Sequence, residues 1–239
     1  MKFWFILLAL TSGLLVASPS QILKDDEGTV HTQESIETPE NLKIELAKVW
    51  KHRLETANQP SMGEVDLSKE LDGVGVIIDK IVNLGKKIWA VVENGRPVVN
   101  VSSVYANAIP AGARSSDLEN FSELQFQSIR HQGVNLYGVT VYEVVYTLVH
   151  RFGGTFQGRG AYLEGVTVLP QKVEVLWGYN VDLKVEQVSA VNTGSSENPV
   201  ASLAMQTSLN VRTVLQEVRL KNLHEFIGNR SEVNSTELR

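Results

Sequence analysis

Cysteine is absent from this chain of 239 residues. The absence excludes a disulfide framework, and it leaves no thiol that could carry a lipid anchor. Because no covalent crosslink is available, the fold must be stabilised by a buried core alone. The ~219 residues that follow position 20 are enough to build such a core, as one large β domain or two small ones.

Basic residues are also scarce. Lysine and arginine number 22 against 27 aspartates and glutamates, and the net charge of −5 becomes −6 when a leader carrying Lys2 is removed. This balance argues against nucleic acid as a partner, because such binding depends on neutralising phosphates. Beyond residue 16, no segment is long and apolar enough to span a bilayer as a helix, which takes ~20 apolar residues.

Motifs for catalysis or metal binding are missing as well. The sequence contains no G-x-S-x-G, H-E-x-x-H or S-x-x-K motif. The five histidines show no metal-ligand spacing; they are His31, His52, His131, His150 and His224. We therefore predict no metal and no cofactor, and the sequence disfavours an enzyme without deciding the question.

The N-terminus has the pattern of a cleavable secretory signal peptide. Lys2 supplies the positive charge, residues 3–16 form the apolar stretch, and small residues follow it. Cleavage is predicted after Ser20 or after Ala17, which makes residues 1–20 the signal peptide. We therefore expect a secreted or periplasmic protein that is released as a free soluble chain.

Two amphipathic helices are predicted before the strands begin. Residues 21–38 are polar and acidic, and we expect them to form a flexible leader. Thr38-Pro39 is typical of a helix start, with Thr38 as N-cap. Apolar residues then recur at helical spacing and predict the first helix within the segment 21–65; they are Leu42, Leu46, Val49, Trp50 and Leu54. A second amphipathic helix is predicted over residues 66–93.

From Pro97 onward, the apolar period changes from that of a helix to that of a strand. Residues 173–185 alternate most cleanly and predict one strand with a buried and a solvated face. Six or more strands joined by turns predict a mainly β fold, an antiparallel β-sandwich preceded by two amphipathic α-helices. The second helix and the sandwich are expected to span residues 66–228, with a disordered tail at 229–239.

Six short runs between residues 80 and 201 are distinctive. They are Lys80–Trp89, Gly95–Val101, Ala106–Pro110, Gly158–Leu163, Trp177–Tyr179 and Asn198–Ala201. Together they resemble an uncharacterised family of exported bacterial β-rich proteins with no assigned activity. The resemblance covers roughly residues 74–220. It implies export, and it brings no catalytic or binding residues with it.

Glu143 and Glu164 form the first candidate site. A tight turn at Gly153-Gly154 would fold residues 137–168 into a hairpin with these two glutamates directly opposite each other. A carboxylate pair suits acid–base chemistry or a divalent cation. The alternative is that a bulge or solvation separates the two charges, because like charges directly opposite destabilise a sheet.

Trp177 and Tyr179 form the second candidate site, since aromatic rings of this kind can stack on a sugar. Their place in the alternating apolar face of 173–185 favours core positions instead.

The function predicted from these features is that of a non-enzymatic binding or structural module with a protein or carbohydrate partner. One alternative is a membrane-active secreted protein, lipid-binding or pore-forming, that inserts a hairpin or uses the second helix as a lever. The other alternative is a hydrolase whose site has no recognisable motif. The oligomeric state is left open by the sequence.

Overall fold

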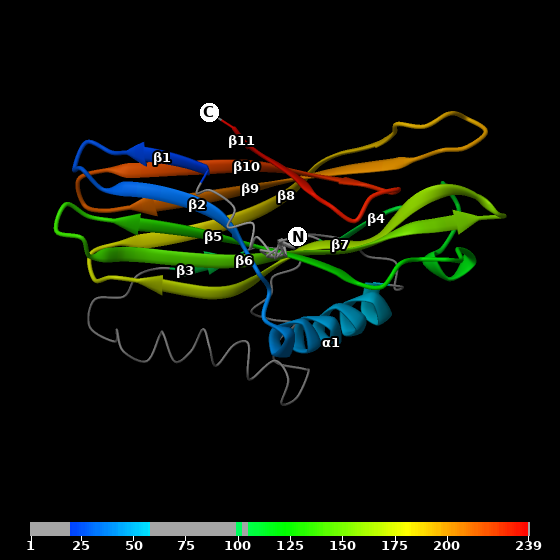
Figure 1. Cartoon of the computed structure of the whole chain (residues 1–239), viewed down its shortest axis with the longest axis horizontal. Coiled ribbons are helices and arrows are strands. Elements are labelled where there is room, and N and C mark those ends of the chain that lie inside the picture. The colour runs from blue at the N-terminus through cyan, green and yellow to red at the C-terminus, as the bar shows by residue number, and fades with distance from the viewer. Residues whose placement is uncertain (1–19, 58–98, 102–104, 239) are drawn as a thin grey trace, which may run out of the picture.

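The computed structural model of the chain describes residues 20–57, 99–101 and 105–238 (Figure 1). These residues form strands, one long helix and a short 3-10 helix at Ser115–Asp117. The long elements are, in chain order, β1 (Ser20–Lys24), β2 (Val30–Ile36), α1 (Glu40–Ala57), β3 (Val99–Val101), β4 (Tyr105–Ala108), β5 (Gln125–Val134), β6 (Thr140–Phe156), β7 (Arg159–Val175), β8 (Asn180–Asn192), β9 (Ala201–Arg212), β10 (Glu217–Ile227) and β11 (Asn234–Leu238). The prediction of a mainly β fold is therefore confirmed.

The strands form two sheets. One has six strands in the order β1-β2-β5-β6-β7-β4, and the other has five in the order β11-β10-β9-β8-β3. All neighbouring strands are antiparallel except β3 and β8, which pair in parallel over Val99–Val101 and Val181–Leu183. Most neighbours are joined by short turns, as antiparallel pairing allows.

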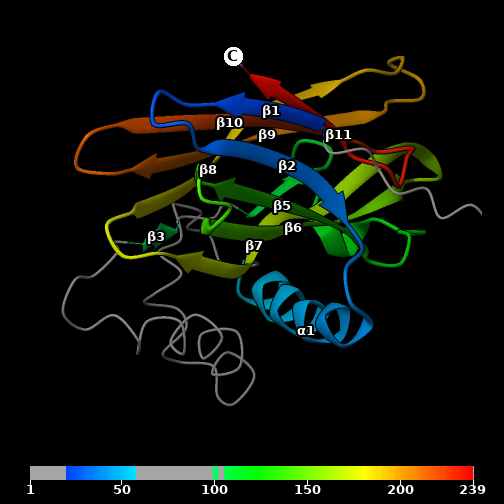
Figure 2. The same ribbon diagram turned by 60° about the vertical axis from the view of Figure 1, so that its left-hand side comes forward.

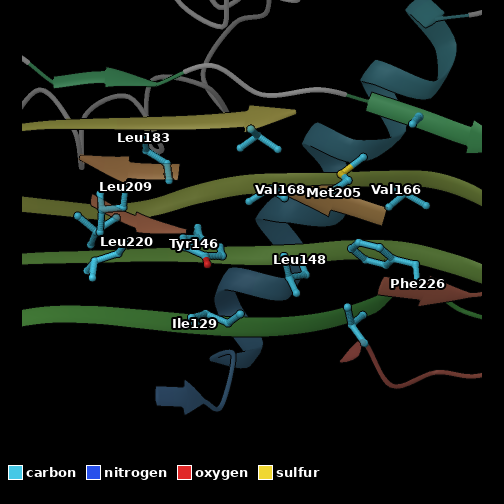
Figure 3. Close-up of a cluster of buried hydrophobic side chains, with 14 of the residues drawn as sticks. Ile129, Tyr146, Leu148, Val166, Val168, Leu183, Met205, Leu209, Leu220 and Phe226 are labelled. Carbon is cyan, nitrogen blue, oxygen red and sulfur yellow. The ribbon is translucent and has the colours of Figure 1, made fainter. Parts of the chain in front are cut away.

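The two sheets lie face to face over one hydrophobic core (Figures 1 and 3). Strand β10 shows the reason, because its inward side chains recur at every second position from Leu220 to Phe226. The first sheet contributes Ile129, Tyr146, Leu148, Val166 and Val168. The second sheet contributes Leu183, Met205, Leu209, Leu220 and Phe226.

Helix α1 covers the outer face of the six-stranded sheet (Figure 2). Its Leu46 and Trp50 are buried against Val149 and Leu169, which point away from the core between the sheets. This confirms the first predicted helix. The helix begins at Glu40, and the hydroxyl of Thr38, the residue predicted as its N-cap, is hydrogen-bonded to Ser128 of β5 at 2.7 Å.

The two ends of the described chain are more ordered than the sequence predicted. The prediction of a flexible leader is wrong, because β1 and β2 form a hairpin whose second strand pairs with β5. The disordered tail is also wrong, because β11 pairs with β10 and Val233 is buried in the core. The side chains of β11 are polar and largely exposed apart from its last residues, and backbone pairing compensates for their few apolar contacts.

Two predictions lie outside the described residues. The second helix, over residues 66–93, falls within the undescribed segment 58–98, and the signal peptide falls almost wholly within residues 1–19. Within the described part of the chain there is one long helix, and no helix is long and apolar enough to cross a membrane.

The predicted register of the β6–β7 hairpin is wrong. The turn lies at Gln157-Gly158, where both residues have positive φ (52° and 73°), as a type I′ turn requires. Gly153-Gly154 lies inside β6, in a stretch where bulges shift the register. As a result Glu143 faces Glu174, and Glu164 faces Arg151.

The single strand predicted over residues 173–185 is also wrong. Its first part belongs to β7 and its last part to β8, and a turn at residues 176–179 separates them. The apolar alternation continues through this turn, and only the glycine at position 178 marks the break.

Candidate binding surface at the strand turns

Four turns lie together at one end of the two-sheet body, at the left of Figure 1. They are residues 25–29 between β1 and β2, 135–139 between β5 and β6, 176–179 between β7 and β8, and 213–216 between β9 and β10. The strand register requires this arrangement, because Val30 pairs with Val134, Tyr142 with Val175, and Asn180 with Arg212. The turns at 135–139, 176–179 and 213–216 are called the apolar turns below.

The first apolar turn is closed by polar backbone chemistry. The Asn135 side-chain oxygen accepts hydrogen bonds from the N–H groups of Tyr137 and Val139, both at 3.0 Å. Gly138 supplies the positive φ of 75° that the chain reversal needs. Asn135 and Gly138 therefore meet the conformational needs of the turn, and neither Leu136 nor Tyr137 is required for it.

The other two apolar turns are built in a similar way. In the turn at residues 176–179, Gly178 has a positive φ of 89° whereas the φ of Trp177 is not positive, which is the pattern of a type II turn. The Tyr179 N–H closes this turn by donating to the Leu176 carbonyl at 3.2 Å. In the last turn the Thr213 hydroxyl accepts from the N–H groups of Leu215 and Gln216. Polar groups or glycine again form the turn, while large apolar residues occupy its tip.

The side chains at these tips are exposed to solvent. Tyr137 is 90 % exposed, Trp177 75 %, Val214 96 % and Leu215 85 %. The described residues include eleven exposed large apolar side chains, and seven of them lie in the apolar turns. Besides the four just named, these are Leu136, Val139 and Leu176. Single exposed apolar residues are common on any protein, but a group of them at one end marks an interaction surface.

The turn at residues 25–29 connects its neighbours. The Asp25 carboxylate accepts hydrogen bonds from Thr29 N–H at 2.7 Å, from Gln216 Nε2 at 2.7 Å, and from His31 Nε2 at 2.9 Å. The other nitrogen of His31 is bonded to the Tyr142 hydroxyl at 2.8 Å. Because Gln216 lies in the turn between β9 and β10 of the second sheet, this cluster links one turn of each sheet.

Charge strengthens the cluster around Asp25. Burial acts to raise the pKa of Asp25, but the hydrogen bonds of His31, Thr29 and Gln216 and the charge of His31 hold it below its ordinary value. The hydrogen-bonded series Asp25–His31–Tyr142 also has the order of an acid–base relay. However, Tyr142 is only 1 % exposed, and burial raises the pKa of its hydroxyl. The arrangement is suited to fixing the turns rather than to attacking a substrate.

Comparison of the chain with protein-family models, curated proteins and solved structures finds no match. The candidate surface is therefore defined by its own geometry and chemistry.

The predicted carboxylate pair is separated in the structure. Glu143 accepts from Lys172 Nζ at 2.6 Å and lies 3.8 Å from Arg130, while Glu164 forms an ion pair with Arg151 at 3.1 Å. Burial raises the pKa of Glu164, and the charge of Arg151 opposes the shift. Each glutamate thus has its own cationic partner, and the two do not form a common site. In the described ranges no group of three or more His, Asp or Glu side chains is arranged to hold a metal ion.

The predicted aromatic pair is also divided. Tyr179 is partly buried against the core, and burial raises the pKa of its hydroxyl while a hydrogen bond to Thr29 acts against the shift. Trp177 points away from the core at the tip of its turn, so its expected core position is wrong. Of the four candidate residues, only Trp177 is part of the exposed surface.

A second polar cluster lies in the interior between the sheets. The Tyr146 hydroxyl lies 3.2 Å from His131 Nε2, from Thr207 Oγ1 and from His224 Nε2. His224 is also bonded through Nδ1 to Ser235 of β11 at 2.8 Å. These side chains join the six-stranded to the five-stranded sheet, and the central four are almost completely buried. Their position favours a structural role over contact with a ligand.

Sequence reasoning missed the apolar turns. It placed Tyr137 at the start of a long strand and Trp177 in the middle of another. The available signals were the spacing of Asn135 and Gly138 and the Trp177-Gly178 step, both of which favour turns.

Proposed function

We propose that the protein is an exported, non-enzymatic binding module of the β-sandwich type that binds through its apolar turns. One observation carries the proposal: most of the exposed large apolar side chains in the described structure gather on three turns at one end. These side chains serve neither the core nor the turn conformations, so folding does not account for their presence there. Binding to an apolar surface does account for it.

The rest of the structure supports this role. The apolar turns project from two sheets that share one core, and the Asp25 cluster bonds one of them, through Gln216, to the turn at residues 25–29. A surface fixed before binding loses little conformational freedom when it docks. Loops carried on a rigid scaffold are a common place for binding residues.

Retention of the full chain on a phenyl resin tests the proposal. The test variant combines Tyr137→Ser, Trp177→Ser and Leu215→Ser, which removes one large side chain from each apolar turn. The matched control combines Ile44→Ser, Val188→Ser and Val191→Ser, which are exposed apolar residues outside these turns. We expect the test variant to elute at clearly higher salt than the wild type, and the control to elute close to the wild type.

An unchanged circular dichroism spectrum should accompany both variants, because none of the six side chains lies in the core. Equal shifts of the two variants, or no shift of the test variant, would show that the apolar turns are not the accessible apolar surface of the molecule. Either result would overturn the proposed function.

A further inference from the structure

The apolar turns differ from a protein-binding groove in shape. Leu136-Tyr137, Trp177 and Val214-Leu215 lie at the tips of separate turns, each with its backbone hydrogen-bonded below it. These tips project into solvent, whereas small-molecule partners are usually held in concave, closely fitted sites. A fluid apolar phase adapts to separate projections without a matching pocket.

The composition of the tips matches the boundary of a lipid bilayer. Trp177 and Tyr137 combine an apolar ring with a polar N–H or O–H group, and such residues are enriched at the membrane–water interface. Leu136, Val214 and Leu215 supply aliphatic side chains for the acyl region. The tips therefore carry both kinds of side chain that an interfacial anchor uses.

The charges around the tips select the kind of lipid. The four turns contain no lysine or arginine, and Asp26 and Glu27 are exposed in the first of them. At the bases of the turns, Arg212 is paired with Asp182 and Arg219 with Glu217. The exposed Lys24 beside the first turn is outnumbered by Asp25, Asp26 and Glu27. The described turns themselves carry no basic side chain, and acidic residues outnumber the basic one beside them, so attraction to anionic headgroups is not favoured.

We propose that the apolar turns dock onto a neutral, zwitterionic lipid surface, with the tips of all three turns in the interface and the sheets outside it. The inference rests on the proposed function and names its partner. The Asp25 cluster fits this role, because through Gln216 it fixes the apolar turn 213–216 to the turn at residues 25–29 of the other sheet.

Flotation of the full chain with phosphatidylcholine liposomes tests the proposal. We expect the wild type to float with the liposomes and the Tyr137→Ser/Trp177→Ser/Leu215→Ser variant to bind at least about tenfold more weakly, since three apolar side chains no longer leave water. The Ile44→Ser/Val188→Ser/Val191→Ser control should float like the wild type. Added salt should not weaken binding, and added phosphatidylserine should not strengthen it.

A fluorescent label locates the contact. Because the chain has no cysteine, Val214→Cys and Val191→Cys each create one site for an environment-sensitive dye. Both positions are exposed, but only Val214 lies in an apolar turn. We expect liposomes to shift the emission of the dye at position 214 to shorter wavelength and to leave the dye at position 191 unchanged.

Several outcomes would overturn the lipid assignment. One is equal flotation of wild type and test variant; another is binding that requires phosphatidylserine and is lost in salt. A dye at position 214 that reports an apolar surrounding without liposomes would mean that another part of the chain covers the turns. If the variants differ on the phenyl resin but no protein floats, the lipid surface is excluded while the proposed function stands. If they do not differ on the resin, both proposals fail.

Discussion

Histidine side chains are the residues that make the interior sensitive to acid. His131, His150 and His224 are almost completely buried, and burial lowers their pKa values to about 4, 4 and 3. For His224 the charge of His131 adds to the shift, and for His150 the backbone of Arg230 opposes it. All three are therefore neutral in the folded protein at neutral pH, whereas an unfolded histidine has a pKa near 6.5.

Stability should consequently fall as the pH is lowered from about 6.5 towards 4. In this window the unfolded chain binds protons that the folded protein does not, so the free energy of unfolding decreases with decreasing pH. Each of the three histidines contributes up to about 1.4 kcal/mol per pH unit. Glu164 opposes the trend because burial raises its pKa, with Arg151 limiting the shift. Urea unfolding at a series of pH values measures the slope.

His150→Leu isolates one of these contributions. His150 packs against Phe152 and Phe226, so leucine places a side chain of similar size in an aromatic, apolar site. We expect the slope of unfolding free energy against pH to decrease by up to about 1.4 kcal/mol per unit between pH 6 and 4. An unchanged slope would show that His150 does not take up a proton on unfolding.

Besides its apolar contacts, helix α1 makes a close polar contact with the outer face of β7. The Trp50 indole N–H donates to the Gly165 carbonyl at 2.8 Å, and a Cβ atom on Gly165 would lie 2.2 Å from that nitrogen. Gly165 also has a φ of 65°, which residues other than glycine rarely adopt. Both the strand conformation and the approach of the helix therefore require glycine here.

Gly165→Ala should destabilise the protein by about 2–4 kcal/mol, because it combines backbone strain with displacement of Trp50. Gly112→Ala is the matched control, since Gly112 also has positive φ but no atom lies within 4 Å of its Cβ position. The control should lose only about 1–2 kcal/mol. Urea unfolding measures both. Equal losses would mean that the contact between helix and strand contributes nothing beyond the backbone conformation.

The elements also show what sequence patterns predict well. Helix α1 and the strands of the core were predictable because their buried apolar residues recur at regular spacing. Leu46 and Trp50 are four residues apart, as on one face of a helix, and Leu203 and Met205 are two apart, as on one face of a strand. The hairpin β1–β2 and strand β11 were not, because backbone pairing orders them with few apolar side chains. The apolar turns were missed for the opposite reason: their apolar side chains continue the strand pattern although they face solvent.

For the whole molecule, the two sheets are connected at both ends as well as through the core. At the end with the apolar turns, Gln216 reaches Asp25. At the opposite end, Gly153 N–H donates to the Gly228 carbonyl at 2.8 Å, and Ala161 pairs with Val200 in an isolated bridge. A body held in this way should unfold as one cooperative unit, since neither sheet can leave without exposing the shared core.

Gly228→Ala tests this connection at the end opposite the apolar turns. The added Cβ would lie 2.1 Å from the Ala161 carbonyl oxygen, a backbone atom that cannot move aside by changing rotamer. We expect a loss of about 3 kcal/mol, and we expect it in both sheets, because the segments brought into conflict belong to β7 and to the end of β10. Native-state hydrogen exchange measures this: protection in β6 and β7 and in β9 and β10 should fall by the same free energy. A loss confined to one sheet would mean that the sheets unfold separately, and the rigid body assumed for docking through the apolar turns would then be wrong.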